Sequence, residues 1–236
     1  MVNDALLIDI GNTRIKVRSG RSEFVFNDFT VFLQWVSTQD PKRIFCADVS
    51  GQLESRGTDE SVLQDVLLAK VEQGFQGLLL AYKDVARLGV DRWLAMLASL
   101  QWQEGQGVVV VDAGTALKID VIDSDNHHLG GSIGPGLEMS NQSLGSKAAQ
   151  LKRVELQTDG ALGRDTESCI SYGVVMSAVA LIEQTVLRFC PNGTLLVSGG
   201  DRHYIAQHLK TPHRVIDNLV LDGLAVYAKH SIPEGI

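Results

Sequence analysis

Two segments of the chain share one pattern, and this repetition constrains the fold more than any other feature. Each has an apolar run, a carboxylate, a short turn of small residues and an alternating strand: "LLIDIGNTRIKV" at 6–17 and "VVVVDAGTALKIDV" at 108–121. Self-similarity of this kind predicts a duplicated fold, with two matching turns that face a shared cleft. Burying an ionised carboxylate is costly unless a partner compensates its charge, so Asp9 is expected to line a cleft or face a cation.

Strands and helices alternate around these segments, which predicts an α/β protein. The chain has 236 residues and 44% hydrophobic content, enough for two domains with well-packed cores. Because "QWQEGQG" at 101–107 interrupts the apolar pattern, we place the domains at 1–104 and 105–236. Periodicity predicts strands at 5–10, 13–20, 23–29, 43–50 and 194–200, and helices at 30–38, 58–73, 165–189 and 219–229. "GGSIGPGLEMS" at 130–140 predicts a loop that leads into a helix, and "SGGD" at 198–201 ends a strand.

Charge and cysteine content narrow the classes of partner. The formal net charge is −7, with Lys and Arg scattered along the chain, which argues against a nucleic-acid-binding surface and against an anionic membrane. Small molecules are therefore the expected partners. Cys46, Cys169 and Cys190 are far apart, a pattern typical of reduced thiols in a cytoplasmic protein and not of a disulfide framework or a zinc site. The most apolar helical stretch, 174–182, is too short to span a bilayer.

The composition of the two turns predicts phosphate binding. A turn of Gly with Asn or Thr lets several backbone N–H groups and a hydroxyl point at one anion without a Cβ in the way. An adjacent carboxylate such as Asp9 is suited to hold a divalent cation, and Lys16 is suited to balance the charge of terminal phosphates. One such turn would be weak evidence, because many hairpins turn with Gly and Asn. The pair favours a polyphosphate held from both sides.

A second candidate site lies in "YKDVARLGVDRWLAM" at 82–96, where Gly89 precedes Asp91 and Arg92 and an apolar helical pattern follows. Asp91 at a helix start is typical of a cap that accepts backbone N–H bonds. The same position suits a general base, with Arg92 as a clamp for an anion. Both interpretations can hold together.

Together these motifs resemble the type III pantothenate kinase family, within the superfamily of acetate and sugar kinases, heat-shock chaperones and actin. "DIGNTRIK" at 9–16 resembles the first phosphate motif, "GVDR" at 89–92 the pantothenate motif and "DAGTALKID" at 112–120 the second phosphate motif. The resemblance spans nearly the whole chain, with "GGSIGPG" and "SGGD" in family order. It implies two duplicated ribonuclease-H-like (actin-like ATPase) domains with a central cleft, and a homodimer.

The resemblance also implies an activity, the ATP-dependent phosphorylation of pantothenate to 4′-phosphopantothenate, which is the first step of coenzyme A biosynthesis. Asp91 would be the proton acceptor, Asp9 would hold Mg²⁺ with ATP, and Asp112 would bind a monovalent cation, K⁺ or NH₄⁺. The implied ATP-binding residues are Asp9, Ile10, Gly11, Asn12, Thr13, Arg14, Ile15, Lys16 and Thr115. The implied pantothenate-binding residues are Tyr82, Gly89, Val90, Asp91, Arg92 and Thr166.

One position departs from the family pattern, because Lys118 stands where threonine is common. By strand alternation Lys118 shares a face with Asp120. Two hypotheses follow: an ion pair between these two residues, which we favour, or an altered nucleotide contact. His127 and His128 lie in a polar turn and are expected to be solvated.

Two other functions remain as alternatives. Another small-molecule kinase or a phosphatase of the same fold would share the phosphate turns but would not need "GVDR". A non-enzymatic transcriptional accessory factor of the same family would keep the fold and lose the base. The presence of Asp9, Asp91, Arg92 and Asp112 argues against that factor, as does the acidic net charge. The helix at 165–189 has apolar residues on more than one face, which predicts burial against its own sheet and against a second subunit.

Overall fold

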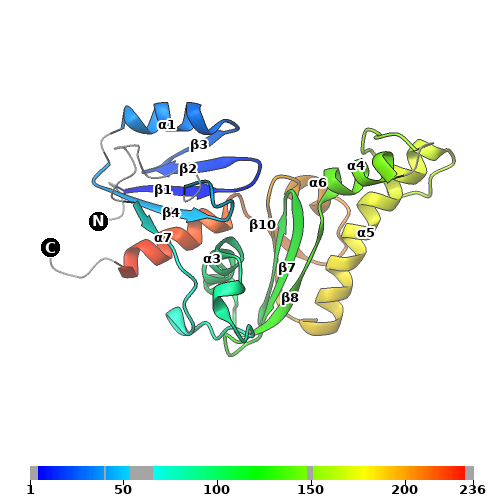
Figure 1. Ribbon diagram of the computed structural model, residues 1–236. Helices are drawn as coiled ribbons and strands as arrows, with labels where there is room; N and C mark the ends of the chain where they lie inside the picture. Colours follow the sequence, from blue (N-terminus) through cyan, green and yellow to red (C-terminus); the bar gives the residue numbers. More distant parts are fainter. Residues whose placement is uncertain (1–4, 40, 54–65, 148–150, 232–236) are drawn as a thin grey trace. The chain divides into compact units, whose positions relative to one another are not determined.

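The computed structural model describes residues 5–39, 41–53, 66–147 and 151–231. The chain forms two compact units. The first combines the N-terminal residues through Leu78 with Tyr82–Ser99 and the residues from Asn218 onward. The second contains Leu79–Ala81 and Leu100–Asp217. Each unit has a five-stranded sheet and a hydrophobic core of its own (Figure 1).

The sheet of the first unit is centred on β1 (Ala5–Ile10), an apolar strand that is buried along its whole length. This strand pairs antiparallel with β2 (Ile15–Ser19) and parallel with β4 (Arg43–Asp48). The outer strands are β3 (Ser22–Phe26), antiparallel to β2, and β5 (Val66–Leu68), parallel to β4. The strand order is therefore β3-β2-β1-β4-β5.

The sheet of the second unit repeats this plan around β6 (Val108–Ala113), which pairs antiparallel with β7 (Ala116–Ile122) and parallel with β9 (Thr194–Ser198). The outer strands are β8 (His128–Pro135), antiparallel to β7, and β10 (His213–Val215), parallel to β9. The strand order is β10-β9-β6-β7-β8. Read from β8 to β10, it has the same succession of antiparallel and parallel pairs as the first sheet read from β3 to β5. This correspondence confirms the predicted duplication.

Helices cover the first sheet on both faces (Figure 1). On one face, α1 (Phe29–Ser37) starts at its N-cap Asp28 and buries Phe32 and Val36 in the core. On the other, α3 (Val90–Ser99) packs closely against α7 (Leu219–Ser231). A Cβ at Gly223 would overlap the backbone carbonyl of Leu94, so this approach of two helices requires glycine. Among its described residues, this unit also has the short 3₁₀ helices η3 (Phe75–Gly77) and η4 (Val85–Arg87).

The core of the second unit lies between its sheet and α5 (Thr166–Phe189). One stripe of α5 at helical spacing, which includes Val174, Ala178, Ile182 and Val186, is buried in this core. The remaining helices of the unit are η5 (Leu100–Trp102), α4 (Leu137–Lys147) and α6 (Arg202–Ala206).

α5 confirms the helix predicted at 165–189, but its apolar part is longer than the stretch 174–182 that was expected to be too short for a bilayer. The helix has 24 residues, so length and composition alone would let it cross a membrane, and 44% of its most apolar window is buried within the protein. A core helix passes the same test. Because one stripe of α5 packs on β6 and β7, we interpret α5 as a core helix.

Three predicted boundaries differ from the structure. Residues 58–65 of the expected helix at 58–73 lie outside the described residues, and 66–68 form β5 because they extend the sheet beside β4. The expected loop at 130–140 is wrong over 130–135, which belong to β8 and pair with β7. The predicted second domain, 105–236, includes α7, which the structure groups with the first unit because α7 packs on α3.

Candidate active site

The first predicted phosphate turn is the hairpin between β1 and β2. Its strands place Asp9 opposite Lys16. The Gly11 N–H donates to the Arg14 carbonyl at 3.0 Å and closes the turn. A Cβ at Gly11 would lie 3.2 Å from that carbonyl oxygen, which is why a residue without a side chain suits this corner.

Exposure divides the residues of this motif into two groups. The side chains at 12–14, at the tip of the turn, are exposed. Ile10 and Ile15 on either side are 0% and 4% exposed and belong to the core. The turn therefore presents polar side chains and backbone to a ligand, whereas the two isoleucines can offer only backbone atoms.

Asp9 is a largely buried carboxylate, with 9% of its surface exposed. Burial raises the pKa of the neighbouring Cys46 thiol well above its usual value, and the negative charges of Asp48 and Asp9 raise it further. Cys46 is therefore a neutral core residue and not a nucleophile. Asp48 accepts backbone N–H bonds from Ser50 and Leu53 at 3.0 and 2.9 Å, so it caps the turn that follows β4.

The start of α3 holds the second candidate site. Asp91 and Arg92 are 7% and 5% exposed, which is rare for charged residues. Asp91 Oδ1 accepts the Arg92 backbone N–H at 2.8 Å, so the carboxylate accepts a backbone bond at the helix start as expected. Because α3 begins at Val90, Asp91 lies within its first turn and is not the N-cap residue. A Cβ at Gly89 would lie 2.6 Å from Asp91 Oδ1. Glycine at position 89 thus leaves the space in which the carboxylate sits.

The guanidinium of Arg92 is positioned by Tyr82. Its Nη1 donates to the Tyr82 hydroxyl at 2.7 Å, and its Cζ lies 5.6 Å from the centre of the tyrosine ring. These contacts bring together residues that are ten positions apart in sequence. Tyr82, Asp91 and Arg92 therefore form one cluster in the first unit.

The second predicted phosphate turn is the hairpin between β6 and β7. Its strands place Asp112 opposite Lys118, and the Gly114 N–H donates to the Ala116 carbonyl at 3.2 Å. Thr115 lies at the tip and is exposed. The carboxylate thus has a lysine as cross-strand neighbour in both units, although the first turn is one residue longer.

Two glycine-rich segments pack directly against the backbone of this second turn. The Gly136 N–H donates to the Thr115 carbonyl at 3.1 Å, and a Cβ at Gly136 would lie 2.7 Å from the same oxygen. Gly199 has a φ of 97°, and a Cβ there would overlap the backbone of Ala113. The Asp201 N–H also donates to the Ala113 carbonyl, at 2.8 Å. Backbone groups of three segments therefore converge at this turn, and side chains at the two glycines would fill the space.

The side-chain partners of Lys118 and Asp120 differ from the favoured prediction. Lys118 Nζ lies 3.1 Å from Asp112 Oδ2. Asp120 is paired instead with His128, at 3.1 Å, and both side chains are almost fully buried. Lys118 therefore has Asp112 as a partner, which the favoured prediction did not name, and the expectation that His128 is solvated is wrong. His127 is exposed over 49% of its side chain and lies 3.4 Å from Asp123.

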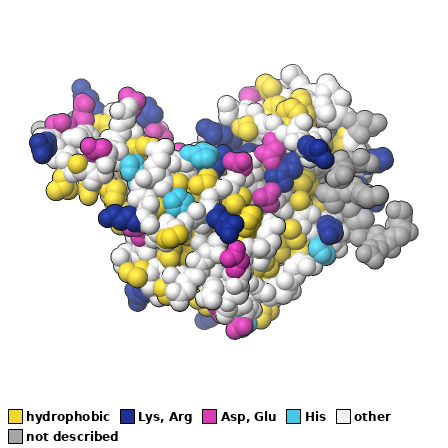
Figure 2. Space-filling view, turned by 180° about the vertical axis from the view of Figure 1, so that it is seen from behind, with side chains coloured by type: hydrophobic (Ala, Val, Ile, Leu, Met, Phe, Trp, Pro, Cys, Tyr) yellow, Lys and Arg dark blue, Asp and Glu magenta, His cyan; other side chains and the backbone are white. Residues whose placement is uncertain are grey.

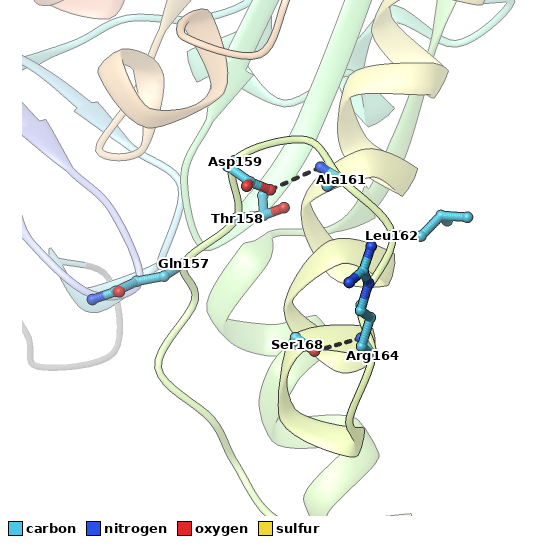
Figure 3. A pocket seen from close by; sticks show the side chains of 8 residues that line it. Gln157, Thr158, Asp159, Ala161, Leu162, Arg164 and Ser168 are labelled. Carbon is cyan, nitrogen blue, oxygen red and sulfur yellow. Dashed lines mark hydrogen bonds between the residues drawn. The ribbon is translucent and has the colours of Figure 1, made fainter.

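Thr166 lies next to the pocket at the start of α5. Figure 3 shows this pocket, which is lined by the loop at 157–164 and by Ser168. Asp165 caps the helix by accepting the Ser168 N–H at 2.8 Å. This bond and the one from the Ser168 hydroxyl lower the pKa of Asp165. Thr166 itself is exposed and does not line the pocket.

The predicted ions fit the two turns differently. Among the described residues, no three His, Cys, Asp or Glu side chains are grouped to hold a metal ion. Mg²⁺ is commonly held by one or two carboxylates together with substrate phosphates and water, so a single carboxylate at Asp9 beside an exposed turn fits that ion. Asp112 does not fit a monovalent cation in the same way, because its carboxylate already forms an ion pair with the Lys118 ammonium.

The surface charge agrees with a small-molecule site. On the face drawn in Figure 2, acidic and basic side chains are interspersed with hydrophobic ones. The net charge of the chain is −7. Neither feature favours contact with a nucleic-acid backbone.

Sequence reasoning missed the pairing of Lys118 with Asp112 and the contacts of Gly136 and Gly199 with the second turn. The glycines were visible in the sequence as "GPG" and "SGG". Their partners depend on tertiary packing, which no local pattern reveals. The cross-strand partner of Lys118 could have been found only from the length of the turn, because the turn length sets the register.

Comparisons with known proteins agree on one family. Residues 37–188 match the family model of type III pantothenate kinase. The type III pantothenate kinase of Laribacter hongkongensis is 32% identical over 238 residues, which cover 96% of this chain and 99% of that protein. The enzyme of the same name from Acinetobacter baylyi is 30% identical over 245 residues, with 97% and 99% covered.

A solved structure supports the fold. A conserved protein of the Baf transcriptional-activator family from Campylobacter jejuni superimposes with a TM-score of 0.68 at 23% identity, covering 96% of this chain and 100% of that chain. At this identity the likeness shows the fold alone. A 2-dehydro-3-deoxygalactonokinase from Sinorhizobium meliloti also shares the fold, with a TM-score of 0.61 at 12% identity, covering 97% of this chain and 99% of that chain. By its sequence matches, the chain belongs to the type III pantothenate kinase family.

Proposed function

We propose that the protein transfers the γ-phosphoryl group of ATP to the primary hydroxyl of pantothenate, giving ADP and 4′-phosphopantothenate. The observation that carries this proposal is the cluster at the start of α3, where Asp91 and Arg92 are 7% and 5% exposed and Arg92 bonds to Tyr82. Buried charges are costly to maintain and mark functional sites more often than surface charges do. A substrate with both a hydroxyl and a carboxylate gives Asp91 a proton to accept and Arg92 an anion to bind.

In this proposal Asp91 accepts the proton of the attacking hydroxyl. Its hydrogen bond from the Arg92 N–H, at 2.8 Å, fixes the direction of the carboxylate. Because Gly89 has no side chain, the Asp91 carboxylate can occupy this position without a clash. A positioned carboxylate of this kind is the usual proton acceptor in kinases, because phosphoryl transfer otherwise asks little covalent chemistry of the protein.

Arg92 binds the carboxylate of pantothenate. A guanidinium forms two parallel hydrogen bonds to a carboxylate, and these fix the orientation of the substrate as well as its affinity. The Tyr82 hydroxyl, 2.7 Å from Arg92 Nη1, limits the rotation of the guanidinium. Tyr82 therefore positions Arg92, in addition to the contact with pantothenate implied by its place in the motif.

The turns at 11–14 and 114–116 bind phosphate oxygens through backbone N–H groups and the hydroxyls of Thr13 and Thr115. ATP bound with Mg²⁺ supplies the phosphoryl group. Asp9 holds the ion, and Lys16 offsets negative charge on the phosphates. These assignments rest on the burial of Asp9 and on the exposure of the tip of each turn.

A coupled assay of ADP release tests the function directly. With ATP and Mg²⁺, we expect ADP release on addition of pantothenate and none on addition of acetate, a sugar or water alone, with 4′-phosphopantothenate identified by mass spectrometry. Release with acetate or a sugar would point to another kinase of this fold. Absence of release with every acceptor would favour a non-enzymatic factor, and either result would refute the proposal.

We further propose that the working unit is a cytoplasmic homodimer that associates through α5, with Thr166 near the partner's pantothenate site. Three apolar side chains of α5, Leu181, Leu187 and Phe189, are 40%, 65% and 53% exposed. Leu181 and Leu187 lie outside the buried stripe, whereas Phe189 follows Ile182 by about two turns and is the last residue of the helix. A second copy of the chain would remove this apolar surface from water.

Leu181→Glu is expected to convert the dimer to a monomer and to lower kinase activity, because a twofold contact is disturbed twice by one substitution. Light scattering and the ADP assay measure the two effects. Gln184→Glu, at an exposed polar position of the same helix, is the matched control. Val175 and Ala178 are unsuitable, since they are 0% and 8% exposed within the protomer and a charge there would test folding. A fully active Leu181→Glu monomer would contradict the shared site.

A further inference from the structure

The ion pair of Lys118 with Asp112 occupies the place at which the family resemblance implies a monovalent cation. Asp112 is the last residue but one of the buried strand β6, and Lys118 lies directly opposite it on β7. Nζ and Oδ2 are 3.1 Å apart, and the two side chains are only 22% and 26% exposed. The hairpin register therefore places the Lys118 ammonium group beside the Asp112 carboxylate.

The physical properties of the two cations are similar. A lysine ammonium is a compact unit positive charge, and K⁺ and NH₄⁺ carry the same charge. A second cation at Asp112 would place two positive charges against one carboxylate, and it would have to displace Lys118 from a partly buried contact. The residues present therefore favour the side chain over a bound ion.

We propose that Lys118 acts as a built-in monovalent cation at the second phosphate turn. Its charge offsets Asp112 next to Thr115 and Gly114, where phosphate oxygens bind, so that neither nucleotide binding nor turnover requires K⁺ or NH₄⁺. This inference rests on the proposed kinase function. It assigns to Lys118 a role that the threonine common in the family cannot fill, because a hydroxyl carries no charge.

The alternative is that the pair only stabilises the hairpin. A pair with only this role would leave nucleotide binding and turnover independent of the identity of residue 118 as long as the hairpin stays folded. The two explanations therefore differ in one measurable respect. A built-in cation predicts that removing the ammonium creates a need for an external cation.

The experiment compares wild type, Lys118→Thr and Lys118→Met in KCl, NaCl and tetramethylammonium chloride at matched ionic strength. Wild type is expected to turn over equally in all three salts. Lys118→Thr opens space beside Asp112 and should lose about 10²- to 10³-fold in turnover in NaCl, the usual cost of removing one preorganised group that stabilises transition-state charge. KCl or NH₄Cl should restore it. Lys118→Met keeps the side-chain bulk without the charge, so it should lose activity in every salt.

Calorimetric binding of a non-hydrolysable ATP analogue in the same salts provides a second readout. Equal affinity of wild type in KCl and NaCl, with K⁺-dependent affinity of Lys118→Thr, is the expected result. Stimulation of wild type by K⁺ but not Na⁺ would overturn the inference, as would full function of Lys118→Thr in NaCl. If wild type bound nucleotide but did not phosphorylate pantothenate, the proposed function would fail and the binding series would still decide the role of Lys118. Absence of nucleotide binding would overturn both.

Discussion

Asp91→Asn is expected to lower kcat by about 10²- to 10⁴-fold, the usual contribution of a general base. Asparagine has the shape of aspartate, and its Oδ1 can still accept the Arg92 N–H that Asp91 accepts at 2.8 Å. The helix start should therefore remain intact while the proton acceptor is lost. Steady-state kinetics measure the effect. Circular dichroism and binding of a non-hydrolysable ATP analogue, both expected to be unchanged, are the controls.

Arg92→Ala separates binding from chemistry at the same cluster. Removal of the guanidinium should mainly raise the KM for pantothenate, since the contact exists in the ground state as well as in the transition state.

Near-normal turnover of Asp91→Asn would exclude Asp91 as the base. A raised KM for ATP with an unchanged KM for pantothenate would reassign Arg92 to the nucleotide.

Gly136→Ala is expected to weaken nucleotide binding strongly, because the new Cβ would lie 2.7 Å from the Thr115 carbonyl oxygen and overlap that of Gly114. The clash is with backbone, which cannot rotate away, so the second phosphate turn must move. Overpacking of this kind costs about 1–3 kcal/mol, equivalent to about 5- to 150-fold in affinity. Calorimetry with the ATP analogue measures it.

Gly134→Ala is the matched control for this substitution. It introduces the same methyl group two residues earlier, where a Cβ would meet nothing within 4 Å. We expect its affinity for nucleotide to equal that of wild type. Equal affinities for both variants would show that the position of the second turn does not matter for nucleotide binding, and would remove that turn from the proposed site.

The sequence predicted the parts of the fold that depend on local patterns. The two strand–turn–strand segments around Asp9 and Asp112 form the corresponding hairpins of two sheets with one topology. The helix start at Asp91 was also predicted, with the contact between its carboxylate and the backbone. These features follow from apolar periodicity and small-residue turns, which act over a few residues.

The errors concern features that depend on distant partners. Val66–Leu68 is a short apolar run that fits a helix or a strand equally well, and only the open edge of β4 makes it a strand. Strand alternation predicted that Lys118 and Asp120 share a face, but it could not predict which residue of the neighbouring strand lies opposite Lys118. The register of β6 and β7 places Asp112 opposite Lys118, and Asp120 is paired with the buried His128. Residue types in one strand cannot decide between such partners.

The contact of Gly223 with Leu94 has a consequence for the order in which the two units fold during synthesis. The helix that carries Asp91 and Arg92 packs against α7, and Leu100–Asp217, nearly all of the second unit, is synthesised between them. Domains generally fold as units while the chain emerges from the ribosome. The second unit is therefore ready to fold before the first, and the proposed base acquires its final support only after translation has passed residue 223. The half of the enzyme that starts first is completed last.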